Sequence, residues 1–277
     1  MEKINWFPGH MQKALRMMEA EVKNVDAVIY VLDSRAPFAC LNPEFVRIIG
    51  EKPILYVLNK IDLADAKKLG QVKQNLPGQN KNVIELNSTA SGALKLVSSS
   101  LTNLCKEKIE KFKNKGVNYF VRAMVLGVPN SGKSTLVNNL CGVGKAVTGD
   151  KPGVTKGKQW VKLSNNIEIL DTPGTLWPNL ENESNARKLA FVGSIKDDVI
   201  SVEELCLFLI EELCSQYKAE FEERFSVETE EKTPLEIMEE IAKNRKYVIK
   251  GGELDYERTA KAIVDDFRKG RIGKITL

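Results

Sequence analysis

The stretch Gly127–Ser134 (GVPNSGKS) has the residue types and spacing of a loop that holds phosphate groups. Its glycines let successive backbone N–H groups turn toward phosphate oxygens at the N-terminus of the following helix. Lys133 would reach the β- and γ-phosphates of a nucleotide, and the Ser134 hydroxyl would bind Mg²⁺. A glycine-rich turn without a ligand is the alternative. The predicted contacts are Gly127, Asn130, Ser131, Gly132, Lys133, Ser134 and Thr135.

Two later features carry groups suited to the metal ion and the γ-phosphate. Asp171–Gly174 (DTPG) follows an apolar run, so the Asp171 carboxylate would support Mg²⁺ and the Gly174 backbone would sense the γ-phosphate. Thr155 lies between the two motifs, and its hydroxyl would complete the Mg²⁺ shell; a solvated loop threonine is the alternative. The predicted Mg²⁺ ligands are therefore Ser134, Thr155 and Asp171.

Base specificity is predicted from Asn59, Lys60 and Asp62 in the motif NKID. A carboxylate can accept hydrogen bonds from the N1–H and the exocyclic amine of guanine, whereas adenine offers no such pair of donors. Asn87 and Ser88, which end the next apolar run, would support the base through backbone N–H groups. An ATPase or kinase is the alternative that this motif disfavours, and tight ATP binding that outcompetes GTP would restore it.

These motifs need a scaffold that brings their loops together. Apolar runs rich in β-branched residues alternate with helical patterns, which predicts a mainly parallel sheet covered by helices. In this α/β fold class the ligand lies beyond the carboxyl ends of the strands. The predicted strands are Ala27–Leu32, Ile54–Leu58, Val83–Leu86, Phe120–Leu126 and Ile167–Leu170. A helix is expected over Lys133–Leu140.

From about Asn179 onward, helical patterns follow one another without strands. We therefore predict an α/β nucleotide-binding domain over residues 1–178 and a small all-helical domain over residues 179–277. Asp255 is a suitable N-cap for the last helix. The acidic segment Glu220–Lys232 is expected to be a solvated connector. The predicted helices are Glu183–Val192, Val202–Tyr217, Pro234–Lys243 and Asp255–Lys269.

The composition is that of an ordinary globular protein, with 43% hydrophobic and 28% charged residues. The net charge of +4 permits a nucleic-acid partner without requiring one. Five cysteines without paired spacing disfavour a disulfide framework or a zinc site. The N-terminus lacks an apolar signal segment, and no apolar run approaches the roughly 20 residues that span a bilayer. A soluble cytoplasmic protein without a membrane partner is expected.

The order of the motifs is unusual, because the base motif precedes the phosphate loop and Asp171–Gly174 comes last. Most GTPases begin with the phosphate loop, and such a circular permutation is possible where domain termini lie close together. Five further stretches are distinctive: Trp6–Met11 (WFPGHM), Asp33–Pro37 (DSRAP), Asp171–Pro178 (DTPGTLWP), Lys250–Asp255 (KGGELD) and Asp266–Lys274 (DFRKGRIGK). With these stretches the chain resembles, over nearly its whole length, the YlqF/RbgA family of circularly permuted P-loop GTPases.

This resemblance implies a GTPase that binds GTP and GDP and acts on late precursors of the large ribosomal subunit through their rRNA. It implies that His10, the single histidine, positions or activates the attacking water; a surface histidine at a helix start is the alternative. Thr175 stands where the Ras-like template has glutamine and where family members usually have an apolar residue. Related GTPases with asparagine in the phosphate loop use it to bind K⁺, so Asn130 predicts K⁺ beside Mg²⁺; a turn asparagine is the alternative. We expect a monomer.

Basic residues near the C-terminus are the candidates for RNA contact. Interleaved acids also fit a solvated surface, and the resemblance favours RNA, bound through phosphate contacts that weaken with salt. The sequence does not choose between a helix cap and an RNA contact for Asp33 and Arg35. The candidate RNA contacts are Lys243, Arg245, Lys246, Lys250, Arg258, Lys261, Arg268, Lys269, Arg271 and Lys274.

Asp171–Gly174 leads almost directly into the predicted helical domain, so we expect GTP binding to set the orientation of that domain. A nucleotide-independent distance between the two domains would contradict this. The rival function is a non-enzymatic, GTP-gated assembly placeholder whose hydrolysis is incidental. That function requires His10→Ala to bind and release subunits normally.

Overall fold

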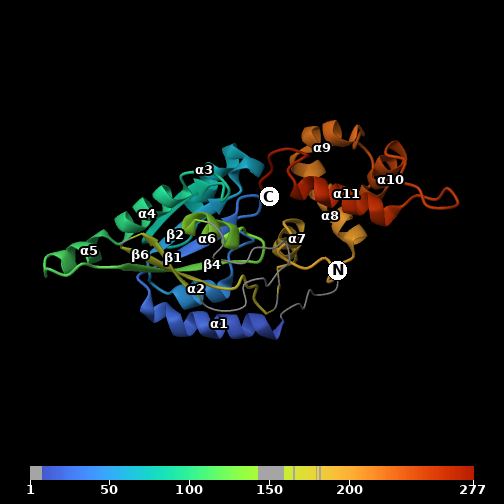
Figure 1. Cartoon of the computed structure of the whole chain (residues 1–277). Coiled ribbons are helices and arrows are strands. Elements are labelled where there is room, and N and C mark those ends of the chain that lie inside the picture. Colours follow the sequence, from blue (N-terminus) through green and yellow to red (C-terminus); the bar gives the residue numbers. More distant parts are fainter. Residues whose placement is uncertain (1–7, 143–158, 165, 179, 181) are drawn as a thin grey trace.

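The computed structural model describes residues 8–142, 159–164, 166–178, 180 and 182–277. Thr155 therefore lies outside the described residues. A six-stranded sheet with the order β3-β2-β1-β4-β6-β5 forms the centre of the N-terminal part (Figure 1). Its strands are β1 (Ala27–Asp33), β2 (Ile54–Asn59), β3 (Lys81–Leu86), β4 (Val121–Gly127), β5 (Gln159–Ser164) and β6 (Ile167–Asp171).

The sheet is mainly parallel, as predicted, and all five expected strands are present. The sequence prediction missed β5, which pairs antiparallel with β6 at one edge. In this strand Val161 and Leu163 are buried whereas Trp160 and Lys162 are exposed. A half-exposed edge strand alternates polar and apolar residues, so it lacks the continuous apolar run by which the buried strands were found.

Both faces of the sheet are covered. In β1, Val28, Tyr30 and Leu32 belong to one hydrophobic cluster, and the residues between them belong to another. The helices α1 (Gly9–Glu21), α2 (Pro43–Ile49) and α3 (Ala66–Asn75) contribute to the first cluster. The second is completed by α4 (Ala93–Leu104) and α6 (Lys133–Cys141), and α5 (Lys106–Lys113) extends beyond α4. This two-sided burial explains why β1 is a continuous apolar run up to Leu32.

The C-terminal part is helical, and the four helices predicted there are present within two residues at each end. Their bounds are α7 (Glu183–Phe191), α8 (Val202–Gln216), α10 (Pro234–Asn244) and α11 (Tyr256–Arg268). Asp255 caps α11 as predicted, since its carboxylate accepts a hydrogen bond from the Arg258 N–H at 3.0 Å. The solvated connector predicted over 220–232 is wrong in its first part. Residues Lys218–Phe225 form α9, whose Phe221 and Phe225 are buried.

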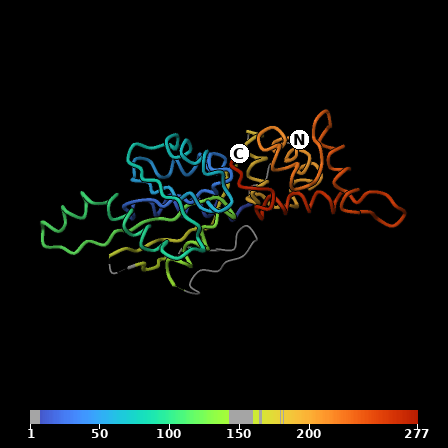
Figure 2. The backbone as a smooth tube through the Cα atoms, turned by 90° about the horizontal axis from the view of Figure 1, so that it is seen from above, coloured from blue at the N-terminus to red at the C-terminus, as the bar shows by residue number. Residues whose placement is uncertain are grey.

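The sheet and the C-terminal helices lie side by side (Figures 1 and 2) and share buried apolar side chains. Leu32 in β1, Leu176, Phe191 in α7 and Phe267 in α11 belong to a single hydrophobic cluster. The rings of Phe191 and Phe267 meet edge to face, with 6.3 Å between their centroids. The domain boundary at residue 178 stays a prediction. In the described part of the chain, no helix is both long enough and apolar enough to cross a membrane.

Candidate nucleotide-binding site

The predicted motifs meet at one edge of the sheet. Asp33 at the end of β1 is in register with Asn59 at the end of β2, and Gly127 at the end of β4 pairs with Val31. Asp171 ends β6, which pairs with β4. The strand order turns back at β1, which lies between β2 and β4. Loops on either side of such a switch point diverge and leave room for a ligand.

The phosphate loop has a backbone that its glycines make possible. Gly132 has φ of 90°, and a Cβ at this position would lie 2.1 Å from Asn59 Nδ2. A Cβ at Gly127 would lie 2.8 Å from the Val31 carbonyl oxygen. The loop ends where α6 begins at Lys133. Close packing therefore explains the glycines, and the N–H groups at the start of α6 are suited to phosphate.

Asn59 holds three loops together. Its side-chain NH₂ donates to the Ser131 carbonyl at 2.8 Å, and its oxygen accepts from the Ser88 N–H at 2.9 Å and the Ser88 hydroxyl at 2.8 Å. Asn59 is only 1% exposed. Its amide thus joins the base motif to the phosphate loop and to the loop after β3.

Lys60 also crosses to the phosphate loop. It has φ of 60°, and its ammonium group donates to the Asn130 carbonyl and to Asp33 Oδ2, each at 2.7 Å. Asn130 itself has φ of 58°, a conformation that asparagine tolerates better than most residues. The lysine of the base motif therefore holds the backbone of the phosphate loop at Asn130.

Asp62 differs from these braced residues. It is exposed in the short 3₁₀ turn η2 (Ile61–Leu63), and its carboxylate forms no hydrogen bond or ion pair within the described ranges. In the following loop, the Ser88 and Thr89 N–H groups donate to the side chains of Asn59 and Asn87. Asp62 is accordingly the base-motif side chain that is open to a ligand, whereas those two N–H groups are engaged inside the protein.

Lys133 and Asp171 form a buried ion pair. The Lys133 ammonium donates to Asp171 Oδ1 at 2.6 Å, and the two side chains are 4% and 1% exposed. The other carboxylate oxygen, Oδ2, is buried without a partner among the residues that the structure describes. A buried oxygen without a partner is costly unless a ligand or water binds it. This carboxylate and the Ser134 hydroxyl are hard oxygen donors, so the residues fit Mg²⁺.

The DTPG loop packs directly on the phosphate loop. A Cβ at Gly174 would lie 3.0 Å from Pro129 Cα, and the Thr175 N–H donates to the Gly127 carbonyl at 3.3 Å. The Thr175 hydroxyl is buried and has no hydrogen-bond partner in the described part of the chain. Movement of one of these loops must therefore disturb the other.

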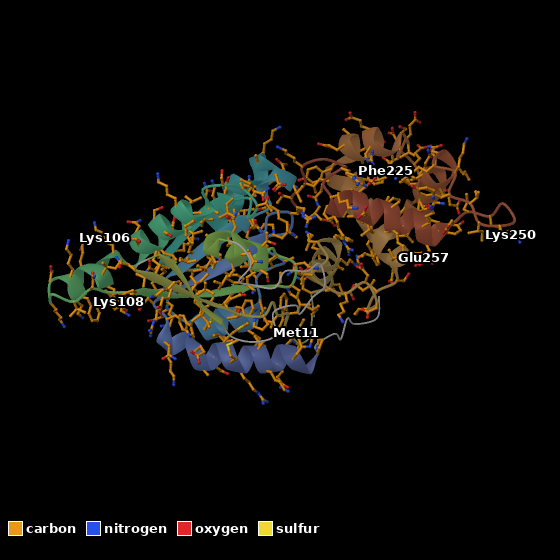
Figure 3. All side chains as sticks on the ribbon, viewed as in Figure 1. Met11, Lys106, Lys108, Phe225, Lys250 and Glu257 are labelled. Atoms are coloured by element: carbon orange, nitrogen blue, oxygen red, sulfur yellow. The ribbon has the colours of Figure 1, made fainter. Side chains whose placement is uncertain are left out.

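The start of α1 lies against the same loop. Met11, which Figure 3 labels on α1, is fully buried. The Leu176 N–H points at its sulfur at 3.5 Å. His10 immediately precedes Met11 and is exposed. The fold thus places the start of α1, where His10 lies, beside the DTPG region, a contact that the sequence alone does not reveal.

Asp33 and Arg35 form the interaction that sequence reasoning missed. The Arg35 guanidinium donates from Nε to Asp33 Oδ1 at 2.9 Å and from Nη2 to Oδ2 at 2.7 Å. Burial alone would raise the pKa of Asp33, but Arg35 and Lys60 outweigh it and hold this pKa well below its ordinary value. Arg35 is 2% exposed, which rules out the RNA contact considered for it. Its Nη1 instead donates to the carbonyl of Arg268, the last residue of α11, so Arg35 caps the end of that helix. The spacing of Asp33 and Arg35 in the sequence does not by itself reveal that both side chains are buried.

Residues after α7 contact the phosphate loop from the C-terminal side. The Asn130 side-chain NH₂ donates to the Gly193 carbonyl at 2.6 Å, and the Ser194 hydroxyl donates to the Pro129 carbonyl at 2.7 Å. The first bond uses the amide nitrogen, whereas K⁺ would be bound through the amide oxygen. The K⁺ ligand therefore stays a prediction.

Comparison with known proteins identifies the family of this chain. Residues 122–249 match the family model of the 50S ribosome-binding GTPase. The match starts in β4, which leads into the phosphate loop, and leaves out the base motif that comes earlier in this chain. Ribosome biogenesis GTPase A of Bacillus cereus is 36% identical over 274 residues, which cover 99% of this chain and 93% of that relative. The chain belongs to the ribosome biogenesis GTPase A family.

Solved structures support this assignment. A GDP-bound YlqF structure has a TM-score of 0.64 and 27% identity, covering 94% of this chain and 97% of that one. GNP-bound YlqF from T. maritima has a TM-score of 0.62 and 29% identity, covering 95% and 97%. Membership of the ribosome biogenesis GTPase A family confirms that the chain is a GTPase with a circularly permuted motif order.

The basic residues of this ribosome biogenesis GTPase A relative fall into two groups. Arg245 and Arg268 are half-buried and bonded inside the protein, to Asp266 at 3.1 Å and Asp197 at 2.7 Å respectively. The other predicted RNA contacts are exposed: Lys243, Lys246, Lys250, Arg258, Lys261, Lys269, Arg271 and Lys274. Lys250 lies at the end of the molecule farthest from the sheet (Figure 3).

Proposed function

We propose that this GTPase hydrolyses GTP to GDP and phosphate during late assembly of the large ribosomal subunit, bound to the precursor particle through rRNA. The observation that carries the proposal is the convergence of the phosphate loop, the base motif and Asp171–Gly174 at one sheet edge. Relatives named for ribosome biogenesis direct the proposal to the ribosome. The protein acts as a monomer.

In this proposal the nucleotide is bound by the phosphate loop, the start of α6 and the base motif. The N–H groups at the start of α6 and the Lys133 ammonium hold the phosphates, so Lys133 exchanges Asp171 for phosphate oxygens. Asp62 accepts hydrogen bonds from guanine, because its carboxylate is exposed and unengaged among the described residues. Asn59 and Lys60 act indirectly, since they hold the phosphate loop in place. Gly174 responds to the γ-phosphate through its backbone.

Two metal ions assist the reaction in this proposal. Ser134, Asp171 and Thr155 hold Mg²⁺, which when bound neutralises charge on the phosphate oxygens. The unpartnered Asp171 Oδ2 supports this ligand set. Asn130 holds K⁺ through its amide oxygen, and the bond from its amide nitrogen to Gly193 fixes the orientation of the side chain.

His10 orients or deprotonates the attacking water. The contact between Met11 and Leu176 supports this role, because it anchors the start of α1 beside the DTPG loop. His10 is exposed, so a docked ribosomal particle is needed to fix its side chain. We therefore expect slow hydrolysis by the isolated protein and fast hydrolysis on the particle.

The decisive experiment measures GTP hydrolysis in KCl and in NaCl, with and without purified large ribosomal subunits. Stimulation of at least about 10-fold by the subunits, greater in KCl than in NaCl, is the expected outcome for a docked general base. GTP binding without stimulation would instead favour the GTP-gated placeholder. Failure to bind GTP in preference to ATP would contradict the guanine site itself.

A further inference from the structure

The C-terminal residues 275–277 are bonded to the loops that carry the base motif. The Ile275 N–H donates to the Leu63 carbonyl at 3.0 Å, directly after the base motif. The Thr276 hydroxyl donates to the Ser34 carbonyl at 3.0 Å and accepts from the Asp65 N–H at 3.1 Å. These bonds join the carboxyl ends of β1 and β2 to a segment more than 200 residues later in the chain.

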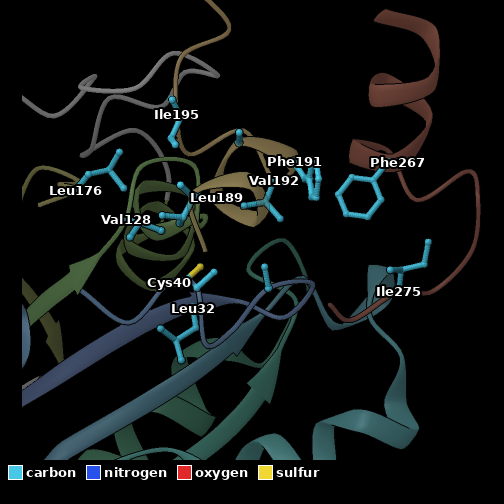
Figure 4. Packing of buried hydrophobic residues seen from close by; sticks show 14 of the residues in the cluster. Leu32, Cys40, Val128, Leu176, Leu189, Phe191, Val192, Ile195, Phe267 and Ile275 are labelled. Carbon is cyan, nitrogen blue, oxygen red and sulfur yellow. The ribbon is translucent and has the colours of Figure 1, made fainter. Parts of the chain in front are cut away.

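Arg35 extends the same connection to α11. The Leu277 N–H donates to the Arg35 carbonyl at 2.7 Å. The Arg35 guanidinium donates from Nη1 to the Arg268 carbonyl at 2.9 Å, at the end of α11, and lies 5.5 Å from the Phe267 ring centroid. Figure 4 shows Phe267 in α11 and Ile275 in the segment that follows this helix. One arginine therefore holds both the end of α11 and the segment that follows it.

The other side of Arg35 leads to the phosphate loop. Its guanidinium donates two hydrogen bonds to the Asp33 carboxylate. Asp33 also accepts a hydrogen bond from the Lys60 ammonium, which donates a second bond to the Asn130 carbonyl. Four residues thus form a continuous path of hydrogen bonds from the phosphate loop to α11. Asp33 is the central residue of this path, because its carboxylate pairs with both Arg35 and Lys60. Its side chain is fully buried.

A second path joins the same two ends. The Asn130 side chain donates to the Gly193 carbonyl, just after α7. Arg268 donates to the Phe191 carbonyl at 3.2 Å and to the Ala190 carbonyl at 2.9 Å, at the end of α7. The two paths close a ring that runs through the phosphate loop, α7 and α11. A shift of the phosphate loop therefore reaches α11 from both sides.

We infer that Asp33 and Arg35 are positioning residues that couple the nucleotide site to the docking of α11 and residues 275–277. The inference rests on the proposed placement of the phosphates at the loop that Lys60 supports. A buried ion pair is not separated gradually, since a lone buried charge is strongly unfavourable. Interfaces of this kind switch between discrete arrangements. Coupling is reciprocal, so release of α11 also alters nucleotide affinity.

Hydrogen exchange measured by mass spectrometry tests the coupling in the full chain. Peptides that cover α11 and residues 275–277 are compared without nucleotide, with GDP and with a non-hydrolysable GTP analogue. We expect nucleotide to change their exchange rates by at least about five-fold, the lower end of typical allosteric coupling. Unchanged rates at saturating nucleotide would overturn the inference. A failure to bind nucleotide, measured separately with fluorescent GDP, would overturn the proposed function instead.

Arg35→Lys is the informative variant, because lysine keeps the charge but not the planar fork that reaches Asp33 and the Arg268 carbonyl together. We expect its nucleotide-dependent change in exchange to fall below about two-fold, within the range of weak coupling. Arg224→Lys is the matched control, since Arg224 pairs with the buried Asp266 inside the C-terminal helices. It should keep the wild-type response. A full response in Arg35→Lys would overturn the inference.

A second variant covers the case in which Arg35→Lys does not fold. Thr276→Val keeps the shape of a buried side chain but removes the hydroxyl that bonds Ser34 and Asp65. Thermal unfolding identifies the variants that are folded at the temperature of the experiment. Loss of the nucleotide response in folded Thr276→Val supports the coupling, and a full response contradicts it.

Discussion

Individual side chains in this site mostly bind one another. Asn59, Lys60 and Asp33 all have protein partners, and each joins two segments that are distant in sequence. Asp62 remains open toward solvent. The motif residues therefore divide into those that hold loops in place and those that face a ligand. Substitutions of the two kinds should have different effects, because only the first kind should also reduce stability.

Asp62→Asn should weaken GTP binding without destabilising the fold. An asparagine amide offers one acceptor and one donor group, so the donor meets a guanine N–H instead of accepting from it. Loss of a charged hydrogen bond costs about 1.5–3 kcal/mol, or roughly 10- to 150-fold in affinity. Equilibrium titration with fluorescent GDP and GTP measures this. An unchanged affinity would contradict the assignment of Asp62 to the base.

His10→Ala should slow subunit-stimulated hydrolysis by about 10²- to 10⁴-fold, as expected for removal of a positioned acid or base. GTP affinity should remain within about two-fold, because His10 is outside the phosphate loop. Single-turnover hydrolysis on the subunits separates the two effects. Gln12→Ala, an exposed neighbour on α1, is the control and should behave like wild type. Equal rates in both variants would remove His10 from the mechanism.

The elements position these residues through a few tight junctions. The β4–α6 connection is the tightest, since Gly132 leaves no space for a Cβ beside Asn59. The connection between α10 and α11 is the opposite case, because its Val248 and Ile249 are about half exposed. Val248 pairs with Leu254 in a single antiparallel bridge. The first connection is closely packed, and the second leaves two apolar side chains open to solvent.

Gly132→Ala should reduce nucleotide affinity. The added methyl group would displace Asn59 and strain a residue with φ of 90°, and overpacking of this kind costs about 1–3 kcal/mol. Gly70→Ala is the control, because a Cβ there meets nothing within 4 Å in the middle of α3. That variant should gain about 0.5–1 kcal/mol of stability and bind nucleotide normally. Calorimetric titration and urea unfolding compare the two.

Lys246→Ala combined with Lys250→Ala should weaken binding to large-subunit rRNA. Because each lost lysine–phosphate interaction reduces the slope of log affinity against log salt by about one, the double variant should reduce it by about two. Filter binding at several KCl concentrations measures the slope. Lys13→Ala, an exposed lysine on α1, controls for the general decrease in positive charge. An unchanged slope in the double variant would show that this connection does not bind RNA.

Asp33, Arg35 and Arg268 lie at the junction between the sheet and the C-terminal helices. Asp33 is fully buried with two cations, so its charge contributes only while both partners stay in place. By contrast, Asp197 is 63% exposed on its pair with Arg268. Exposed pairs contribute little because water and salt screen them. The acid stability of the protein should therefore depend much more on Asp33 than on Asp197.

Asp33→Asn should lower the free energy of unfolding by about 3–5 kcal/mol at pH 7, the usual cost of breaking a buried ion pair. The folded-state pKa of Asp33 lies below its unfolded value of about 3.9. Its contribution is therefore complete above about pH 5 and is lost as pH falls below about 4 toward the folded-state pKa. Urea unfolding from pH 3 to 7 should show wild type and variant converging in acid. Asp197→Asn should show little difference throughout.

The sequence by itself determined the motifs and most of the elements, with β5 and α9 as the exceptions. Continuous apolar runs indicated the buried strands, the 3.6-residue period indicated the C-terminal helices, and short-range chemistry set the Asp255 cap and the glycine-rich turn. The motif types predicted a permuted GTPase because each motif is local to one loop. These features depend on residues within a few positions of one another, so they can be derived without a fold.

Only the tertiary structure decided how distant segments meet. The bond from Arg35 to Arg268 joins residues 233 positions apart, and no periodic pattern indicates such a pairing. The same holds for Met11 beside Leu176 and for residues 275–277 beside the base motif. Burial turned Asp33 and Arg35 from candidate surface residues into an internal ion pair. Burial depends on what packs over a residue, which is decided by the whole fold.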